Sequence, residues 1–142
     1  TSVTVRAVHC VTLVVQGASW LASGEGVEID TTWQGMATGL FGGEGLFWVK
    51  CSGRGDVLLN SFGGIYALDV DGGHVVDTGH VVAFEDTLEL NIGKAASGWI
   101  SSFTSGEGLV CKFSGRGKLY CQTHHPSNFG RMLGKRLKPR EA

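Results

Sequence analysis

Ser-Gly-Arg-Gly occurs twice in this chain of 142 residues, at positions 52–55 and again at positions 114–117. Upstream of each copy, Gly-Glu-Gly-Leu also occurs twice, at positions 43–46 and 106–109. The two motifs recur at offsets of 62 and 63 residues. Repetition at a nearly constant period indicates a protein built from repeated structural units, and we therefore predict two copies of one unit of about sixty residues.

Short apolar segments within each unit indicate β-strands. Residues 27–30 and 87–92 alternate apolar with polar side chains, as in a strand with one buried face. Apolar segments also flank each Ser-Gly-Arg-Gly, and a short glycine-rich connection between two strands is typical of a β-hairpin. We therefore predict that each Ser-Gly-Arg-Gly is a hairpin loop in an all-β protein with internal pseudo-repeats.

The repeat also predicts how the chain is divided. We expect a single domain over residues 1–142, with pseudo-repeats over about residues 9–64 and 72–125. Residues 3–8 resemble residues 65–70 in their position before the next copy. We interpret residues 3–8 as the last strand of a preceding copy, so the chain is expected to be part of a longer protein or a shortened member of its family.

Composition and charge exclude several classes of protein. Hydrophobic residues make up 42 % of the chain and charged residues 18 %, which argues against a disordered protein. The net charge of -1 gives no overall reason to expect a nucleic acid as partner. No apolar segment approaches the roughly eighteen residues that a membrane-spanning helix needs. Because Cys10, Cys51, Cys111 and Cys121 lack the spacing of zinc ligands, we expect reduced thiols and a cytoplasmic location.

The C-terminal segment, residues 126–142, has a different pattern. Ser127 or Asn128 is a suitable N-cap, apolar residues follow at helical spacing, and Pro139 ends the predicted short helix. The segment could bind phosphate or an anionic membrane surface, or its apolar stripe could dock on the sheet while the charges face solvent. We favour docking. The basic residues concerned are Arg131, Lys135, Arg136, Lys138 and Arg140.

Comparison of the two copies separates architecture from candidate chemistry. Glu44 and Glu107 occupy matching positions, and a carboxylate needed once for catalysis has no reason to recur, so we interpret both as parts of an interface or structural motif. Arg54 and Arg116 also match. Either arginine could bind carboxylate or phosphate, but we favour pairing with acidic residues on a neighbouring copy or subunit.

His74, His80 and Glu85 are weak candidates for metal ligands, because β-proteins often hold metals through histidine. The first copy has Thr12 and Ala18 where the second has these histidines, and the spacing is not that of a close histidine pair. We therefore expect no metal, no cofactor and no catalytic residue.

Cys111 and Cys121 form a second candidate pair. If residues 115–117 are a hairpin loop, the two thiols face each other across neighbouring strands. We predict that they are neighbours and able to oxidise.

Several longer segments resemble those of the altered inheritance of mitochondria protein 24 family. The resemblance implies a β-sandwich like that of the tryptophan RNA-binding attenuation protein, a fold often described alongside double-stranded β-helices. It implies no assigned catalytic residues, and it implies a further pseudo-repeat before the region present here. It also implies a mitochondrial location if the source is a eukaryote. The segments are Gly-Leu-Phe-Gly-Gly-Glu-Gly-Leu-Phe at 39–47, Val-Asp-Thr-Gly-His-Val-Val-Ala-Phe at 76–84, Ser-Gly-Glu-Gly-Leu-Val at 105–110 and Leu-Tyr-Cys-Gln-Thr at 119–123.

Together these observations favour a non-enzymatic β-sandwich that forms homo-oligomers, a trimer being one arrangement, and acts as a scaffold or binding module. Exposed sheet edges are the physical reason, since closing a ring of subunits covers them. Two alternatives stay open. The first is a small-ligand or metal-binding protein of the double-stranded β-helix type, and the second is binding of nucleic acid or an anionic surface through the basic tail, although we consider nucleic acid a poor fit.

Overall fold

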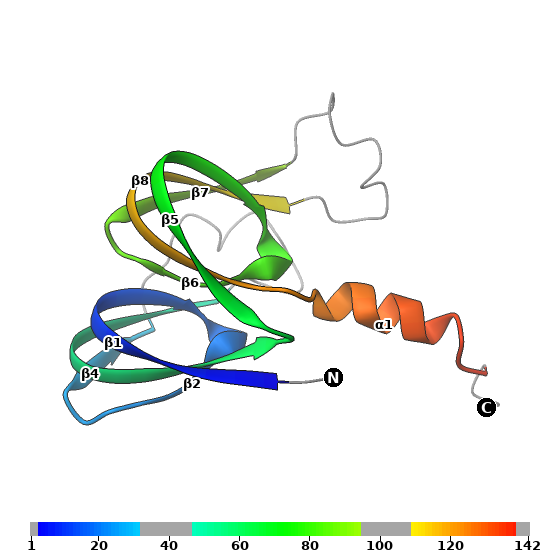
Figure 1. Cartoon of the computed structure of the whole chain (residues 1–142), viewed down its shortest axis with the longest axis horizontal. Helices are drawn as coiled ribbons and strands as arrows, with labels where there is room; N and C mark the ends of the chain where they lie inside the picture. The colour runs from blue at the N-terminus through cyan, green and yellow to red at the C-terminus, as the bar shows by residue number, and fades with distance from the viewer. Residues whose placement is uncertain (1–2, 32–46, 95–108, 139–142) are drawn as a thin grey trace.

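The computed structural model describes residues 3–31, 47–94 and 109–138. Antiparallel strands dominate these residues and one short helix follows them, which confirms the predicted all-β class (Figure 1). Two single-turn 3₁₀ helices, η1 (Gly17–Ser19) and η2 (Thr78–His80), interrupt the strands. The remaining elements are β1 (Val3–Gln16), β2 (Trp20–Ser23), β3 (Val27–Asp30), β4 (Trp48–Phe62), β5 (Ile65–Asp77), β6 (Val81–Glu85), β7 (Leu88–Lys94), β8 (Leu109–Gln122) and α1 (Pro126–Gly134).

The same order of elements occurs twice, and we call the two copies unit one (residues 3–62) and unit two (residues 65–122). In unit one the long strand β4 pairs with β1, β2 and β3, and in unit two β8 pairs with β5, β6 and β7. Val3 pairs with Phe62, so residues 3–8 belong to unit one by strand pairing. The interpretation of residues 3–8 as the last strand of a preceding copy is therefore wrong.

The Ser-Gly-Arg-Gly motifs lie in the middle of β4 and β8, and neither forms a hairpin loop. Gly53 and Gly115 have φ angles of 119° and 102°, a region that side chains other than glycine rarely adopt. A Cβ atom on Gly53 would overlap the carbonyl oxygen of Gly26, and one on Gly115 would lie 3.0 Å from the carbonyl oxygen of Thr87. The glycines therefore allow a close approach to the chain before β3 and β7, while the long strands continue without reversing.

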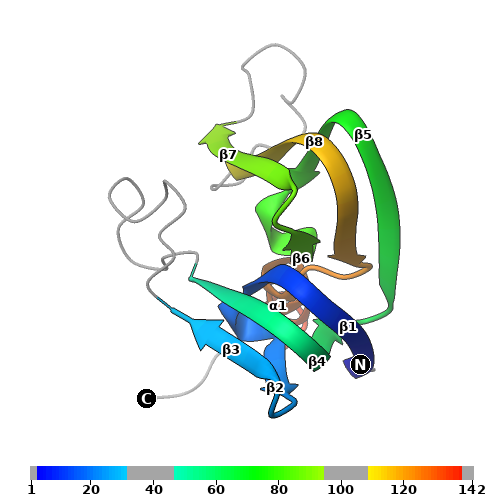
Figure 2. The ribbon, with the colours of Figure 1, turned by 90° about the vertical axis from the view of Figure 1, so that its left-hand side faces the viewer.

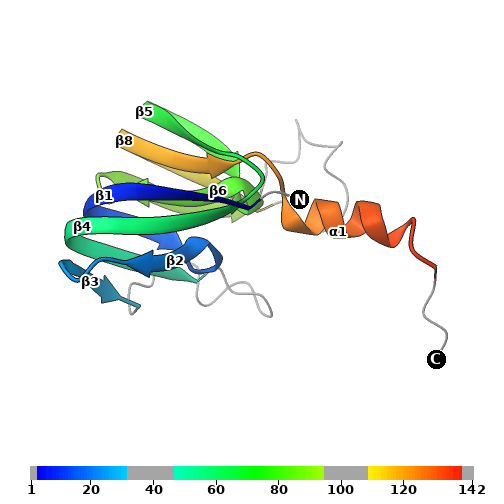
Figure 3. The ribbon, with the colours of Figure 1, turned by 60° about the horizontal axis from the view of Figure 1, so that its bottom comes forward.

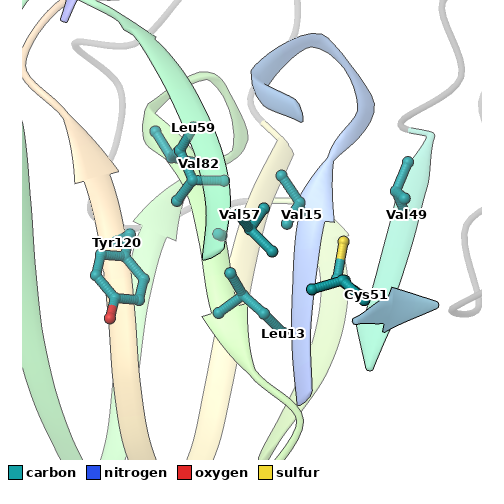
Figure 4. Packing of buried hydrophobic residues seen from close by; sticks show 10 residues of the cluster. Leu13, Val15, Val49, Cys51, Val57, Leu59, Val82 and Tyr120 are labelled. Carbon is teal, nitrogen blue, oxygen red and sulfur yellow. The ribbon is translucent and has the colours of Figure 1, made fainter. Parts of the chain in front are cut away.

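The strands form one curled sheet with the order β2-β4-β1-β6-β8-β5, while β3 and β7 pair with the long strands outside this path (Figure 2). Two buried clusters result from this arrangement. The first contains mainly residues of unit one, and Figure 4 shows its side chains. The second contains mainly residues of unit two, with Phe84 packed edge-on against Trp48 and Phe113 at centroid distances of 5.5 and 5.1 Å.

Helix α1 follows β8 directly and extends away from the strands (Figures 1 and 3). Its N-cap is His125, whose Nδ1 accepts a hydrogen bond from the backbone N–H of Ser127 at 3.2 Å. The predicted N-cap, Ser127 or Asn128, is therefore wrong by at least two residues. Proline at the next position explains the start, since proline suits the first helical residue.

Candidate functional site

A short ladder between β1 and β6 joins the two units. Leu13 pairs with Glu85, Val14 with Phe84, and Val15 with Ala83. Alternate residues of a strand point to opposite faces, so β1 contributes to both clusters. Val14 packs in the second cluster, whereas the residues on either side of it pack in the first.

Strand β6 is shared in the same way. Val82 and Ala83 belong to unit two by sequence but pack in the first cluster, whereas Val81 and Phe84 pack in the second. Each strand of this joint thus helps to fill the core of the other unit. An ion pair also crosses the joint, since Nζ of Lys50 on β4 lies 3.0 Å from a carboxylate oxygen of Asp86, which follows β6.

The counterparts of the joint strands have no such neighbour among the described residues, because β2 and β5 are the two ends of the sheet path. The register identifies the matching residues. Leu13 faces Cys51, and His74 faces Phe113, at matching positions just before Ser-Gly-Arg-Gly. His74, Val75 and Val76 are therefore the counterparts of Leu13, Val14 and Val15, and the expected match of His74 to Thr12 is wrong by one residue.

The counterparts on β2 follow from the same comparison. Trp20 pairs with Leu59, as Val81 pairs with Cys121 in unit two. Both strands have a register shift immediately afterwards, so Leu21 matches Val82. Continuing the alignment, Ala22, Ser23 and Gly24 match Ala83, Phe84 and Glu85.

Exposure differs sharply between matched positions. Val75 is 59 % exposed, whereas Val14 is fully buried. Leu21 is 49 % exposed, whereas Val82 is fully buried. Strands β2 and β5 were not identified as edge strands from the sequence, although the sequence contains one indication of the difference. A strand buried on both faces reads as a continuous apolar segment, and Val81-Val82-Ala83-Phe84 is such a segment.

A partly buried polar network lies where unit one, unit two and the helix meet. The side chain of Gln122 accepts a hydrogen bond from the backbone N–H of Phe62 and donates one to the carbonyl oxygen of Gly79, both at 2.8 Å. Nδ1 of His80 lies 2.8 Å from the carbonyl oxygen of Gln122 and must donate, since a carbonyl only accepts. Nε2 of His125 lies 3.6 Å from a carboxylate oxygen of Asp77. This network connects the base of α1 to the end of β5.

The two matched arginines differ in their partners. Arg116 makes a bidentate pair with Asp71 on β5, in which Nη2 donates to Oδ2 at 3.0 Å and Nε donates to Oδ1 at 3.3 Å. Its acidic partner therefore lies in the same unit, and not on a neighbouring copy as we expected. Arg54 is exposed, and its backbone N–H donates to the carbonyl oxygen of Gly26 at 3.0 Å. Glu44 and Glu107 lie outside the described residues.

The three candidate metal ligands occupy different environments. His74 is exposed on β5, while His80 belongs to the polar network. Oε2 of Glu85 accepts a hydrogen bond from the backbone N–H of Lys118 at 2.8 Å. In the part of the chain that the structure describes, no three His, Cys, Asp or Glu side chains are grouped so as to hold a metal ion.

Cys111 and Cys121 lie on the same strand, β8, and both are buried free thiols of the second cluster. The predicted facing positions across a hairpin are wrong, because β8 does not reverse between them. Burial, together with smaller contributions from the nearby Asp77 and Cys121, raises the pKa of Cys111 to about 12. Burial raises the pKa of Cys121 to about 11, against a hydrogen bond with Tyr66 that lowers it. Their oxidation stays a prediction.

Among the described residues, helix α1 packs on the sheet near its start, where Phe129 lies against Phe62 at a centroid distance of 5.3 Å. Met132, Leu133 and Leu137 are exposed, so the expected docking of the apolar stripe on the sheet is wrong beyond the first turn. The cations of residues 131–138 are exposed as well, and Arg140 lies outside the described residues. None of the helices described here is long and apolar enough to cross a membrane.

These features define an all-β repeat protein with a projecting basic helix, in which the edge strands β2 and β5 have no further partner strand among the described residues. The sequence model of a family described as mitochondrial biogenesis AIM24 matches residues 2–124. An uncharacterized protein of Streptococcus pyogenes serotype M6 is 37 % identical over 106 residues, which are 73 % of this chain and 42 % of that protein. The chain belongs to the AIM24 family, as the sequence motifs indicated.

A solved structure supports the same fold. An X-ray crystal structure of a protein from Streptococcus pyogenes matches with a TM-score of 0.77 and 28 % sequence identity, covering 94 % of this chain and 60 % of that chain. The present chain thus spans less than two thirds of the length of both relatives.

Proposed function

We propose that this chain is a non-catalytic scaffold that assembles into homo-oligomers through its sheet edges. The observation that carries the proposal is that the sheet path ends in two strands, β2 and β5, whose matched strands are paired and buried inside the chain. Unpaired backbone N–H and C=O groups on an edge strand are a template for another strand. Val75 and Leu21 add exposed apolar surface at these edges.

The test is the molar mass in solution. Sedimentation velocity at micromolar concentration should give a species with a mass that is a multiple of 15.0 kDa and that dissociates on dilution. A trimer would agree with our prediction from the sequence. A species that stays monomeric over the whole micromolar range would contradict the proposal. The absence of catalysis and of a cofactor, and the cytoplasmic location, also stay predictions.

A second candidate function is the binding of an anionic membrane surface by α1 and the residues after it. Residues 126–138 contain basic residues but no Asp or Glu, and Met132, Leu133 and Leu137 are exposed. An amphipathic helix of this kind lies in the membrane interface, with its cations near lipid phosphates.

Flotation with vesicles tests this second candidate. Vesicles with phosphatidylserine should retain the protein at low salt, vesicles of phosphatidylcholine alone should retain less, and a chain ending at Thr123 should not bind. Equal flotation of the truncated chain would contradict this function. Salt-sensitive retention on heparin without vesicle binding would instead favour nucleic acid.

A further inference from the structure

We propose that β5 of one copy of this chain pairs with β2 of a second copy, in the register of the internal β1–β6 ladder. The inference rests on the proposed function and names the partner strand. The internal joint shows which residues must face each other. Val14 pairs with Phe84, so their counterparts Val75 and Ser23 pair between copies.

The first support is the pattern of exposed apolar side chains. At the internal joint, Val14 and Val82 each enter the core of the other unit and are fully buried. Their counterparts at the free edges are Val75 and Leu21, which are 59 % and 49 % exposed. In the proposed joint each would enter the core of the other copy, which removes its exposed apolar surface from water and so favours association.

The second support is charge complementarity. The internal joint carries the half-buried ion pair between Lys50 and Asp86. The counterpart of Lys50 is Lys112 on β8, since Lys50 faces Val14 and Lys112 faces Val75. The counterpart of Asp86 is Glu25, which follows β2. Both charges are thus retained at the free edges, where Lys112 and Glu25 are exposed and have no ion pair with any described residue.

The third support is a backbone contact. The N–H of Asp86 donates to the carbonyl oxygen of Thr12 across the internal joint at 3.4 Å. By register its counterparts are the N–H of Glu25 and the carbonyl oxygen of Gly73, which belong to opposite edges of the sheet and would meet in the proposed joint. Each copy has one β5 edge and one β2 edge, so the contact is head-to-tail and can repeat from copy to copy until a ring closes.

Cross-linking tests the register. Val75→Cys and Ser23→Cys are made in separate chains, mixed, and treated with a short thiol-to-thiol cross-linker. The mixture should give a covalent dimer, and either variant alone should not. Glu28→Cys mixed with Val75→Cys is the matched control, because Glu28 is exposed on β3 outside the proposed joint. Equal cross-linking of the control would overturn the inference.

A charge exchange tests the pairing without cysteine chemistry. Lys112→Glu alone and Glu25→Lys alone should each weaken association by about fivefold, the size of an exposed ion-pair effect near 1 kcal/mol. The double variant should return to within about twofold of the original chain, because the pair is restored with reversed signs. Glu28→Lys, with the same charge change on β3, should leave association unchanged.

The outcomes separate the two proposals. If the original chain forms oligomers but neither the cross-link nor the charge rescue occurs, the proposed ladder is wrong and the scaffold function stands. If the chain is monomeric at all micromolar concentrations, both are wrong, and the edges are left for a further unit within a longer chain.

Discussion

Unit one and unit two have the same strands in the same register, yet matched positions differ in burial wherever a unit meets a neighbour. Phe84 on β6 is buried in the second cluster, while its counterpart Ser23 on β2 is only partly buried. Strand β1 is shared by both cores, while β5 has one partner strand among the described residues. The environment of a position therefore depends on the next unit along the sheet as much as on its own unit.

The largest expected effect on stability comes from replacing Phe84, whose burial differs from that of its counterpart Ser23. Phe84→Ala should lower the free energy of unfolding by about 3–5 kcal/mol, because it removes a buried aromatic ring and leaves a cavity between Trp48 and Phe113. Ser23→Ala, the matched change in unit one, should cost less than about 0.5 kcal/mol. Urea unfolding followed by tryptophan fluorescence measures both.

If Phe84→Ala does not fold, Phe84→Leu gives a readable value, since a smaller loss of volume should cost about 1–2 kcal/mol. Equal effects of the Phe84 and Ser23 substitutions would mean that the two strands are equally buried in solution. That result would be expected only at concentrations where copies associate, so the measurement is made in dilute protein.

The second prediction concerns the thiols of unit two. Cys111 and Cys121 occupy positions where unit one has Val49 and Leu59, and burial raises both thiol pKa values above the ordinary value of 9.0. The unfolded chain loses these protons near pH 9, while the folded chain holds them until about pH 11 and 12. Stability is therefore complete below pH 9 and falls as pH rises above it, by up to about 1.4 kcal/mol per pH unit for each thiol.

Unfolding in urea at pH 7.5 and pH 10 measures this loss. Cys111→Val combined with Cys121→Leu gives unit two the residues of unit one and should flatten the pH dependence. A slope that is unchanged in this double variant would assign the alkaline loss to other groups.

The repeat, the all-β class and the C-terminal helix could be predicted from the sequence, because they depend on local patterns and on recurrence. The continuous course of β4 and β8 could not. Two glycines on either side of one arginine suggest a turn, and only the contact of Gly53 with the backbone of Gly26 shows that its positive φ serves a close approach within a strand. The N-cap at His125 was missed because its imidazole is an uncommon cap.

The candidate site was harder to predict from the sequence than the fold, because the site is defined by the register of strand pairing. Arg116 and Asp71 face each other only once β5 is aligned with β8, and the three candidate metal ligands separate for the same reason. The match of Val75 to Val14 and of Lys112 to Lys50 likewise depends on strand pairs that lie far apart in the chain. The recurring motifs identified the two units, whereas the strand pairing identified β2 and β5 as the edge strands.

The smallest expected effect on stability comes from replacing the two matched arginines. Arg116 pairs with Asp71, but both side chains are largely exposed, at 81 % and 73 %. Solvent screens such a pair, so Arg116→Ala should lower the free energy of unfolding by less than about 1 kcal/mol, and 0.5 M salt should remove most of that difference. Arg54→Ala should change stability by no more than the error of the measurement.

A larger loss for Arg54 than for Arg116 would indicate that Arg54 has a partner that appears on assembly, because the isolated fold offers it none among the described carboxylates. Repeating both measurements at concentrations above and below the association midpoint separates these cases, since only a contact between copies depends on concentration.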